Sequence, residues 1–166
     1  LSALREIGLR RCADRAARSA QTVHSKAMYR THDHILVCLS PSPSNEKIIR
    51  TAARMAGAFR CSFTALFVET KAFQWMAQED KARLQANLHL AQQLGASIET
   101  VYGDDVADQI AEFSRLAGVT KIVLGRSGVH HSLFRKTALT DRLIELTPEL
   151  DIHIIPDSGT AARHWD

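Results

Sequence analysis

Residues 34–59, HILVCLSPSPSNEKIIRTAARMAGAF, decide the fold. The stretch opens with a continuous apolar run at 34–40, which is typical of a strand covered on both faces. A loop of prolines and serines follows and ends at Asn45, a residue type that favours the start of a helix. From there, apolar residues recur at helical spacing to about Phe59. The stretch therefore predicts a strand, a loop and a helix in succession, which is the repeating unit of a parallel α/β sheet.

The same unit recurs along the chain. Further strands are predicted at 62–69, 96–102, 121–125 and 151–156, and further helices at about 75–94, from 103–105 to about 117, and at about 137–146. Strands separated by helices of about ten or more residues require right-handed crossovers and a parallel sheet. We therefore expect an α/β fold: a three-layer, doubly wound, five-stranded parallel sheet with the strand order 3-2-1-4-5.

Charge divides the chain unevenly. Residues 1–30 carry seven Lys and Arg and two Asp and Glu, which is a net charge of +5. The whole chain has a net charge of +3, so the remaining residues carry about −2. We interpret 1–30 as an amphipathic helix and linker from a preceding region, 31–157 as the folded domain and 158–166 as a tail. A body so close to neutral does not favour a nucleic-acid polymer as partner.

The cysteines and the apolar runs indicate the compartment. The three cysteines are odd in number and widely spaced, and Cys38 and Cys61 lie inside apolar runs, which favours core thiols in a reducing compartment. No apolar run approaches the ~20 residues that a membrane-spanning helix needs. We therefore expect a cytoplasmic domain.

The strand order predicts where a ligand would bind. In open α/β sheets, ligands bind beyond the carboxyl ends of the strands, where the winding reverses. With the order 3-2-1-4-5, the loops at 40–45 and 125–136 meet at that point. The second loop, GRSGVHHSLFRK, is rich in donors and positive charge, and Gly125 and Gly128 allow close approach of an anion. It predicts a phosphate cradle, with a solvated turn as the alternative.

The first loop, SPSPSN, offers hydroxyl groups and the amide of Asn45 beside that cradle. The alternative is a turn that only caps the following helix. Elsewhere, surface roles are favoured over chemistry: His130 and His131 as surface residues rather than metal ligands, and Asp104, Asp105 and Asp108 as compensation of a helix dipole. Trp75 is expected to be a partial core or lid residue. We expect no catalytic residue and no metal site.

Three blocks of sequence carry a family resemblance. Residues 40–70, SPSPSNEKIIRTAARMAGAFRCSFTALFVET, together with KIVLGRS at 121–127 and TDRLIELTPELDIHII at 140–155, resemble the universal-stress-protein-like domain of the KdpD family of sensor histidine kinases. The resemblance implies a cytoplasmic regulatory domain, itself no enzyme, in a membrane-bound two-component kinase that controls potassium uptake. The implied partners are other domains of that kinase, a second copy and a small nucleotide. The alternative is a nucleotide-free interaction or dimerisation domain of the same kinase.

The resemblance also implies a ligand. Relatives that bind cyclic di-AMP carry S-x-S, then twenty residues, then F-T-A-x-Y. This chain has Ser40 and Ser42, followed at that spacing by FTALF, in which Phe67 replaces the tyrosine. The ATP pattern, G-x2-G-x9-G-[ST], is matched at Gly125 and Gly128 and departs at 138 and 139. No cofactor is required, and cyclic di-AMP is favoured over ATP as ligand. The predicted ligand-binding residues are Ser40, Ser42, Asn45, Thr64, Ala65, Phe67, Gly125, Arg126, Ser127 and Gly128.

Overall fold

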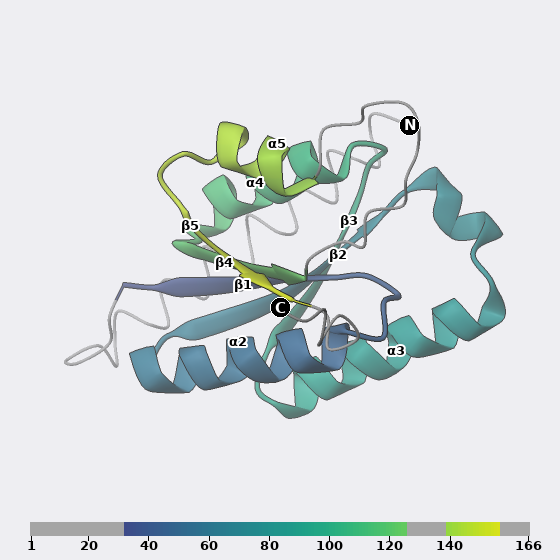
Figure 1. Ribbon diagram of the computed structural model, residues 1–166, viewed down its shortest axis with the longest axis horizontal. Helices are drawn as coiled ribbons and strands as arrows, with labels where there is room; N and C mark the ends of the chain where they lie inside the picture. Colours follow the sequence, from purple (N-terminus) through teal and green to yellow (C-terminus); the bar gives the residue numbers. More distant parts are fainter. Residues whose placement is uncertain (1–31, 126–138, 157–166) are drawn as a thin grey trace, which may run out of the picture.

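The computed structural model describes residues 32–125 and 139–156. Its elements follow the order β1 (His34–Leu39), α2 (Asn45–Phe59), β2 (Ser62–Glu69), the 3₁₀ helix η1 (Lys71–Trp75), α3 (Gln78–Gln93), β3 (Ser97–Tyr102), α4 (Val106–Ala117), β4 (Lys121–Gly125), α5 (Leu139–Leu146) and β5 (Asp151–Ile155). The five strands pair in parallel in the order β3-β2-β1-β4-β5, so the predicted class and strand order are confirmed (Figure 1). The predicted N-terminal helix and C-terminal tail lie outside the described residues.

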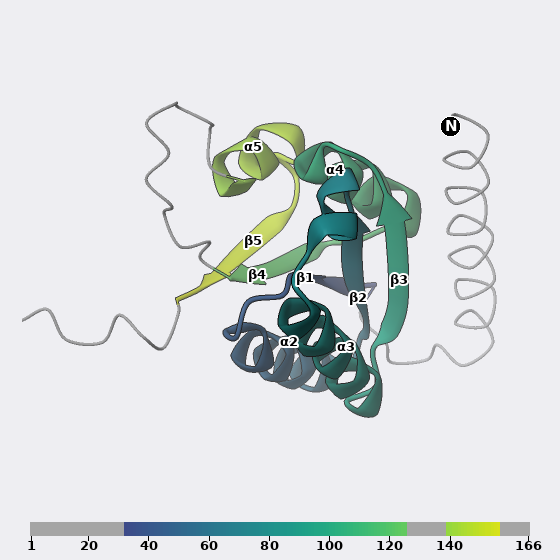
Figure 2. The same ribbon diagram turned by 90° about the vertical axis from the view of Figure 1, so that its right-hand side faces the viewer.

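The sheet is the middle of three layers. Helices α2 and α3 cover one face, and α4 and α5 cover the other (Figure 2). Successive side chains of β1 enter opposite cores: Ile35 and Val37 pack on the α2 and α3 side, whereas Leu36 packs on the α4 and α5 side. All three side chains are fully buried. A strand buried on both faces has no polar alternation, which explains the continuous apolar run in the sequence.

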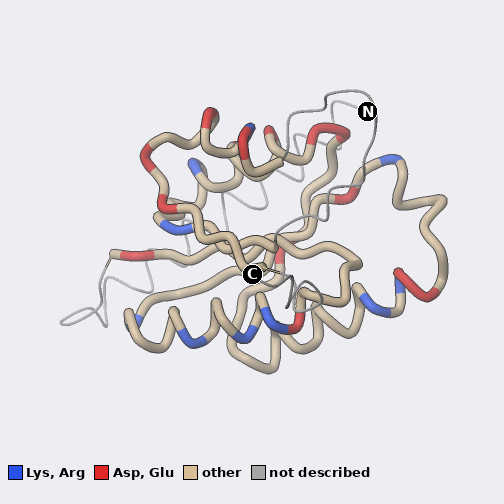
Figure 3. The backbone as a smooth tube through the Cα atoms, viewed as in Figure 1, with Lys and Arg blue, Asp and Glu red and all other residues tan. Residues whose placement is uncertain are grey.

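Charges of both signs are spread over the outer surface. Lys and Arg recur along α2, and Asp and Glu are frequent around α4 and α5 (Figure 3). Many of these charges are paired locally, as Arg50 is with Glu46 one turn earlier on α2 at 2.9 Å. The absence of nucleic-acid binding remains a prediction from the sequence.

One predicted helix differs in the structure. The helix predicted at about 75–94 is observed as α3 and begins three residues later than predicted, because Trp75 ends η1 and Met76 and Ala77 lie between the two helices. Phe73 takes the inward position in η1 and packs on Phe67 with ring centroids 5.6 Å apart. Trp75, two residues further on, is 88% exposed. The partial-core interpretation of Trp75 is therefore wrong, because Phe73 fills that place.

Candidate functional site

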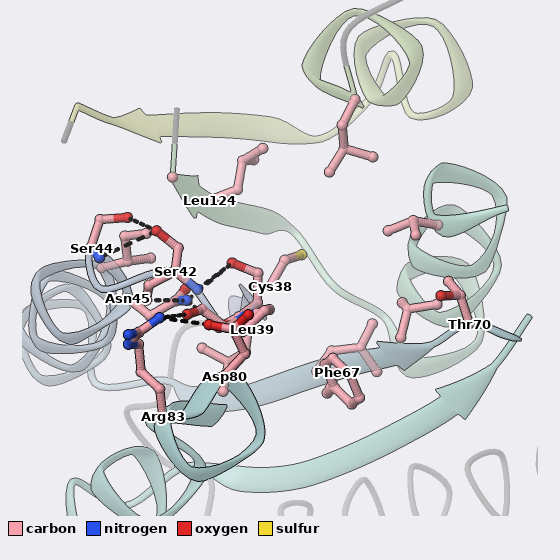
Figure 4. A pocket seen from close by; sticks show the side chains of 18 of the residues that line it. Cys38, Leu39, Ser42, Ser44, Asn45, Phe67, Thr70, Asp80, Arg83 and Leu124 are labelled. Carbon is pink, nitrogen blue, oxygen red and sulfur yellow. Dashed lines mark hydrogen bonds and ion pairs between the residues drawn. The ribbon is translucent and has the colours of Figure 1, made fainter. Parts of the chain in front are cut away.

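A cavity of about 810 Å³ lies at the carboxyl ends of β1, β2 and β4 (Figure 4). Its volume is within the range of small-molecule sites, roughly 300–1,000 Å³. The adjacent strands β1 and β4 lead into connections that run to opposite sides of the sheet, so the cavity lies at the topological switch point. The lining includes Ser40, Ser42, Asn45, Phe67 and Gly125 among the predicted ligand-binding residues.

The loop after β1 is shaped by Asn45, whose side chain is 1% exposed. Its amide nitrogen Nδ2 donates to the Ser40 carbonyl, to Ser40 Oγ at 3.1 Å and to the Ser42 carbonyl at 2.9 Å. Ser42 Oγ lies 2.8 Å from Ser44 Oγ and also accepts from the Ser44 backbone N–H at 3.3 Å. Asn45 therefore holds the loop from inside, and the serine oxygens are placed on the cavity wall before any ligand arrives.

The apolar lining is divided between the two faces of the sheet. Phe67, Phe73 and Ile48 belong to the core on the α2 and α3 side. Leu66 and Leu124 belong to the core on the α4 and α5 side. Neighbouring residues of β2 contribute to both parts because side chains alternate along a strand. The cavity thus extends across the carboxyl ends of the strands from one face of the sheet to the other. The loop at 40–44, called the serine loop below, lies at the end of the central strand β1.

Gly125 ends β4 at the cavity, and its missing side chain has a packing role. A Cβ atom at this position would lie 2.5 Å from Ile48 Cδ1 and 3.6 Å from Ser44 Oγ. The sequence predicted that this glycine admits an anion close to the backbone. Among the described residues, the group that approaches it is the Ile48 side chain on α2.

Two predicted residues of β2 lie away from the described lining. Thr64 is 4% exposed, and its Oγ1 lies 2.8 Å from His34 Nε2. His34 Nδ1 donates to the Ala117 carbonyl at 3.0 Å, and burial lowers the pKa of this histidine. Ala65 is fully buried in the core on the α2 and α3 side. Arg126, Ser127 and Gly128 fall outside the described residues.

The lining residues that the sequence analysis missed include two with charged side chains, Asp80 and Arg83 on α3. Arg83 Nη1 donates to Asp80 Oδ1 at 2.8 Å and to the Pro41 carbonyl at 3.1 Å. In the sequence they form an i,i+3 pair of opposite charges, which is typical of any solvated helix. Only the packing of α3 against the serine loop brings the pair to the cavity.

Comparison with known proteins identifies relatives of the whole chain. The chain is 39% identical to the sensor protein KdpD of Clostridium acetobutylicum over 99% of its own length, and 32% identical to the sensor protein KdpD of Escherichia coli K12 over 98%. The chain is homologous to one segment of KdpD sensor proteins. It spans about a fifth of the length of these curated relatives, 19% in both cases. No protein-family model matches it.

Solved structures place this KdpD-related chain among the universal stress proteins by fold. The crystal structure of a universal stress protein in complex with cAMP superposes with a TM-score of 0.58. The match covers 76% of this chain and 98% of that chain, at 18% sequence identity. The predicted universal-stress-protein-like fold is confirmed.

Two titratable groups at or near the cavity of this KdpD-related chain have shifted pKa values. Burial raises the pKa of the Cys38 thiol on the cavity wall to about 12, so this thiol stays protonated near neutral pH. Asp105 caps α4 by accepting from the Asp108 N–H at 3.1 Å, and its hydrogen bond from Arg142 lowers its pKa. These contacts fit the predicted helix-end role of Asp105, whereas Asp104 forms an ion pair with Lys71.

A metal-binding cluster and a membrane-spanning helix are both absent from the described residues. Ranges 32–125 and 139–156 hold no group of three or more His, Cys, Asp or Glu side chains arranged to bind a metal ion. Within the same ranges, every helix is too short or too polar to cross a bilayer.

Proposed function

We propose that this chain is the cytoplasmic, regulatory nucleotide-sensing domain of a potassium-responsive sensor histidine kinase, and that it binds an adenine nucleotide in the cavity. The observation that carries the proposal is the position of the cavity: it lies at the switch point of the sheet, in a chain homologous to KdpD sensor proteins. The proposed domain spans 31–157, and its partners are other domains of the parent kinase or a second copy. Phosphate transfer belongs to those other domains.

The lining favours a ligand with flat apolar parts and a polar centre. Its apolar residues fall into two groups on opposite faces of the sheet, and the serine loop supplies hydroxyl oxygens and backbone groups. Such a combination, mostly apolar with a few convergent polar groups, is typical of sites that orient a small ligand. A protein of the same fold is described in complex with cAMP, an adenine nucleotide.

Cyclic di-AMP is the proposed ligand in preference to ATP. Ser40, Ser42 and Phe67, from the S-x-S and F-T-A-x-Y pattern, all line the cavity. Ser40 and Ser42 contact phosphate or ribose oxygens, and Phe67 contacts a base or ribose. Thr64 and Ala65 then position the strand from behind the lining. Arg126, Ser127 and Gly128 hold phosphate in this proposal.

Calorimetry with cyclic di-AMP and ATP tests the site. We expect Ser42→Ala and Arg126→Ala each to weaken binding about 10-fold or more, because a charge-assisted contact contributes roughly 1.5–3 kcal/mol. Phe67→Tyr is expected to strengthen binding of cyclic di-AMP by restoring the hydroxyl of the pattern. Ser97→Ala, on the exposed start of β3, is the matched control and leaves affinity unchanged.

Thermal unfolding gives a second measurement. A ligand at 100 times its dissociation constant stabilises the folded state by about 2.7 kcal/mol. Absence of binding heat with both nucleotides at millimolar concentration contradicts the proposal and favours the nucleotide-free interaction domain. Wild-type affinity in Arg126→Ala contradicts the phosphate assignment.

A further inference from the structure

Asp80 and Arg83 are the charged side chains of the described cavity lining. Both lie near the start of α3, and the Arg83 guanidinium bridges this helix to the serine loop through the Pro41 carbonyl (Figure 4). The bridge joins residues far apart in the sequence and acts on the loop that carries Ser40 and Ser42. The cation therefore lies beside the polar part of the cavity.

Arg83 can exchange Asp80 for another anion at little cost in stability. The side chains of Arg83 and Asp80 are 39% and 41% exposed, and ion pairs with this much solvent access contribute little to stability. Both contacts use Nη1, whereas a guanidinium carries five N–H donors in a planar fork that matches phosphate oxygens. Asp80 lies in the first turn of α3, where the helix dipole favours a negative charge even without a partner.

We propose that Arg83 binds a phosphate group of the nucleotide and that Asp80 is the anion with which this phosphate competes. The inference rests on the proposed function, which it deepens. Arg83 favours phosphorylated ligands, because a phosphate offers several oxygens to the guanidinium donors and can replace Asp80 as the partner of this cation. The Asp80 carboxylate opposes every anion at this position, so it lowers the affinity of the site and raises the ligand concentration at which the site fills.

The test uses calorimetry of the whole chain with cyclic di-AMP. Arg83→Gln keeps an N–H donor for the Pro41 carbonyl and removes the charge, and we expect about tenfold weaker binding. Asp80→Asn keeps the shape and removes the competing anion, and we expect about threefold tighter binding. Arg50→Gln and Glu46→Asn alter an exposed ion pair on α2 and are the matched controls, with affinity unchanged.

The outcomes separate this inference from the proposed function. If Arg83 only braces the loop, Arg83→Gln binds as wild type and Asp80→Asn gains nothing; either result overturns the inference while nucleotide binding stands. If wild type binds neither cyclic di-AMP nor ATP, the proposed function fails and this inference fails with it. Thermal midpoints within a few degrees of wild type establish that each variant is folded.

Discussion

Replacing Gly125 by alanine measures how closely β4 packs against α2 beside the cavity. The new Cβ would lie 2.5 Å from Ile48 Cδ1, whereas carbon atoms in contact are about 3.5–4.0 Å apart. Ile48 is 2% exposed and lies between the core and the cavity wall, and its Cδ1 has to shift by about 1 Å. Overpacking of this kind costs roughly 1–3 kcal/mol, and we expect a loss of about 2 kcal/mol in the free energy of unfolding.

A second substitution isolates the clash. Ile48→Val removes Cδ1, the atom that the new Cβ would meet, and on its own costs about 1 kcal/mol. If the clash is the cause, the double variant loses less than the two single variants together. We expect a coupling free energy of about 1 kcal/mol or more, in the range found for residues in contact.

Urea unfolding followed by circular dichroism provides the free energies of unfolding of the wild type, the two single variants and the double variant, which together form a double-mutant cycle. Gly57→Ala in α2 is the control, because a Cβ there has nothing within 4 Å. Glycine is less favourable than alanine in a helix, so this control is expected to stabilise by about 0.5–1 kcal/mol. A Gly125→Ala variant within about 0.5 kcal/mol of wild type, or an additive cycle, would refute the reasoning.

Three other predictions concern the loop, the opposite end of the sheet and the domain limits. Asn45→Ala removes the buried donor to the Ser40 and Ser42 carbonyls, and urea unfolding should show a loss of about 2 kcal/mol; an unchanged midpoint contradicts the role of Asn45. Burial lowers the pKa of His34 in the folded chain, so below about pH 6.5 the unfolded chain takes up a proton at a higher pH than the folded chain does. The contribution of the neutral His34 to the free energy of unfolding is therefore full above about pH 6.5 and is lost as the pH falls through the folded pKa. Urea midpoints between pH 8 and 5 should therefore fall more steeply in wild type than in His34→Gln, and parallel profiles would contradict this. A chain that begins at Tyr29 should keep its melting temperature within a few degrees, and loss of cooperative unfolding would overturn the proposed domain limits.

The central strands were predictable because burial on both faces leaves a direct mark on the sequence. The run predicted at 34–40 forms β1 at His34–Leu39, and the run predicted at 62–69 forms β2 at Ser62–Glu69. The start of α3 left no such mark. Ala77, which precedes α3, offers no side-chain cap. The sequence therefore placed the start of this helix at Trp75, which in the structure is the last residue of η1.

The sequence predicted the position of the candidate site but only part of the residues that line it. The switch-point rule locates the loop after β1, whose serines line the cavity. The rule does not predict that Arg83 lines the cavity, because its hydrogen bond to the Pro41 carbonyl depends on how α3 packs against the loop and not on a sequence pattern in α3. Thr64 was predicted as a ligand-binding residue from its place in a sequence pattern. The pattern does not reveal that its hydroxyl forms a hydrogen bond with His34 on the adjacent strand.

The central position of β1 has a consequence for synthesis of the chain on the ribosome. β2 follows β1 closely and covers one of its hydrogen-bonding edges, but β4, which covers the other, begins only at Lys121. Domains fold from the N-terminal side as they are made, and unpaired strand edges in such nascent intermediates promote aggregation. A nascent chain that has passed β3 therefore still exposes one hydrogen-bonding edge of its central strand. The interval before β4 emerges is when we expect this domain to depend most on a chaperone.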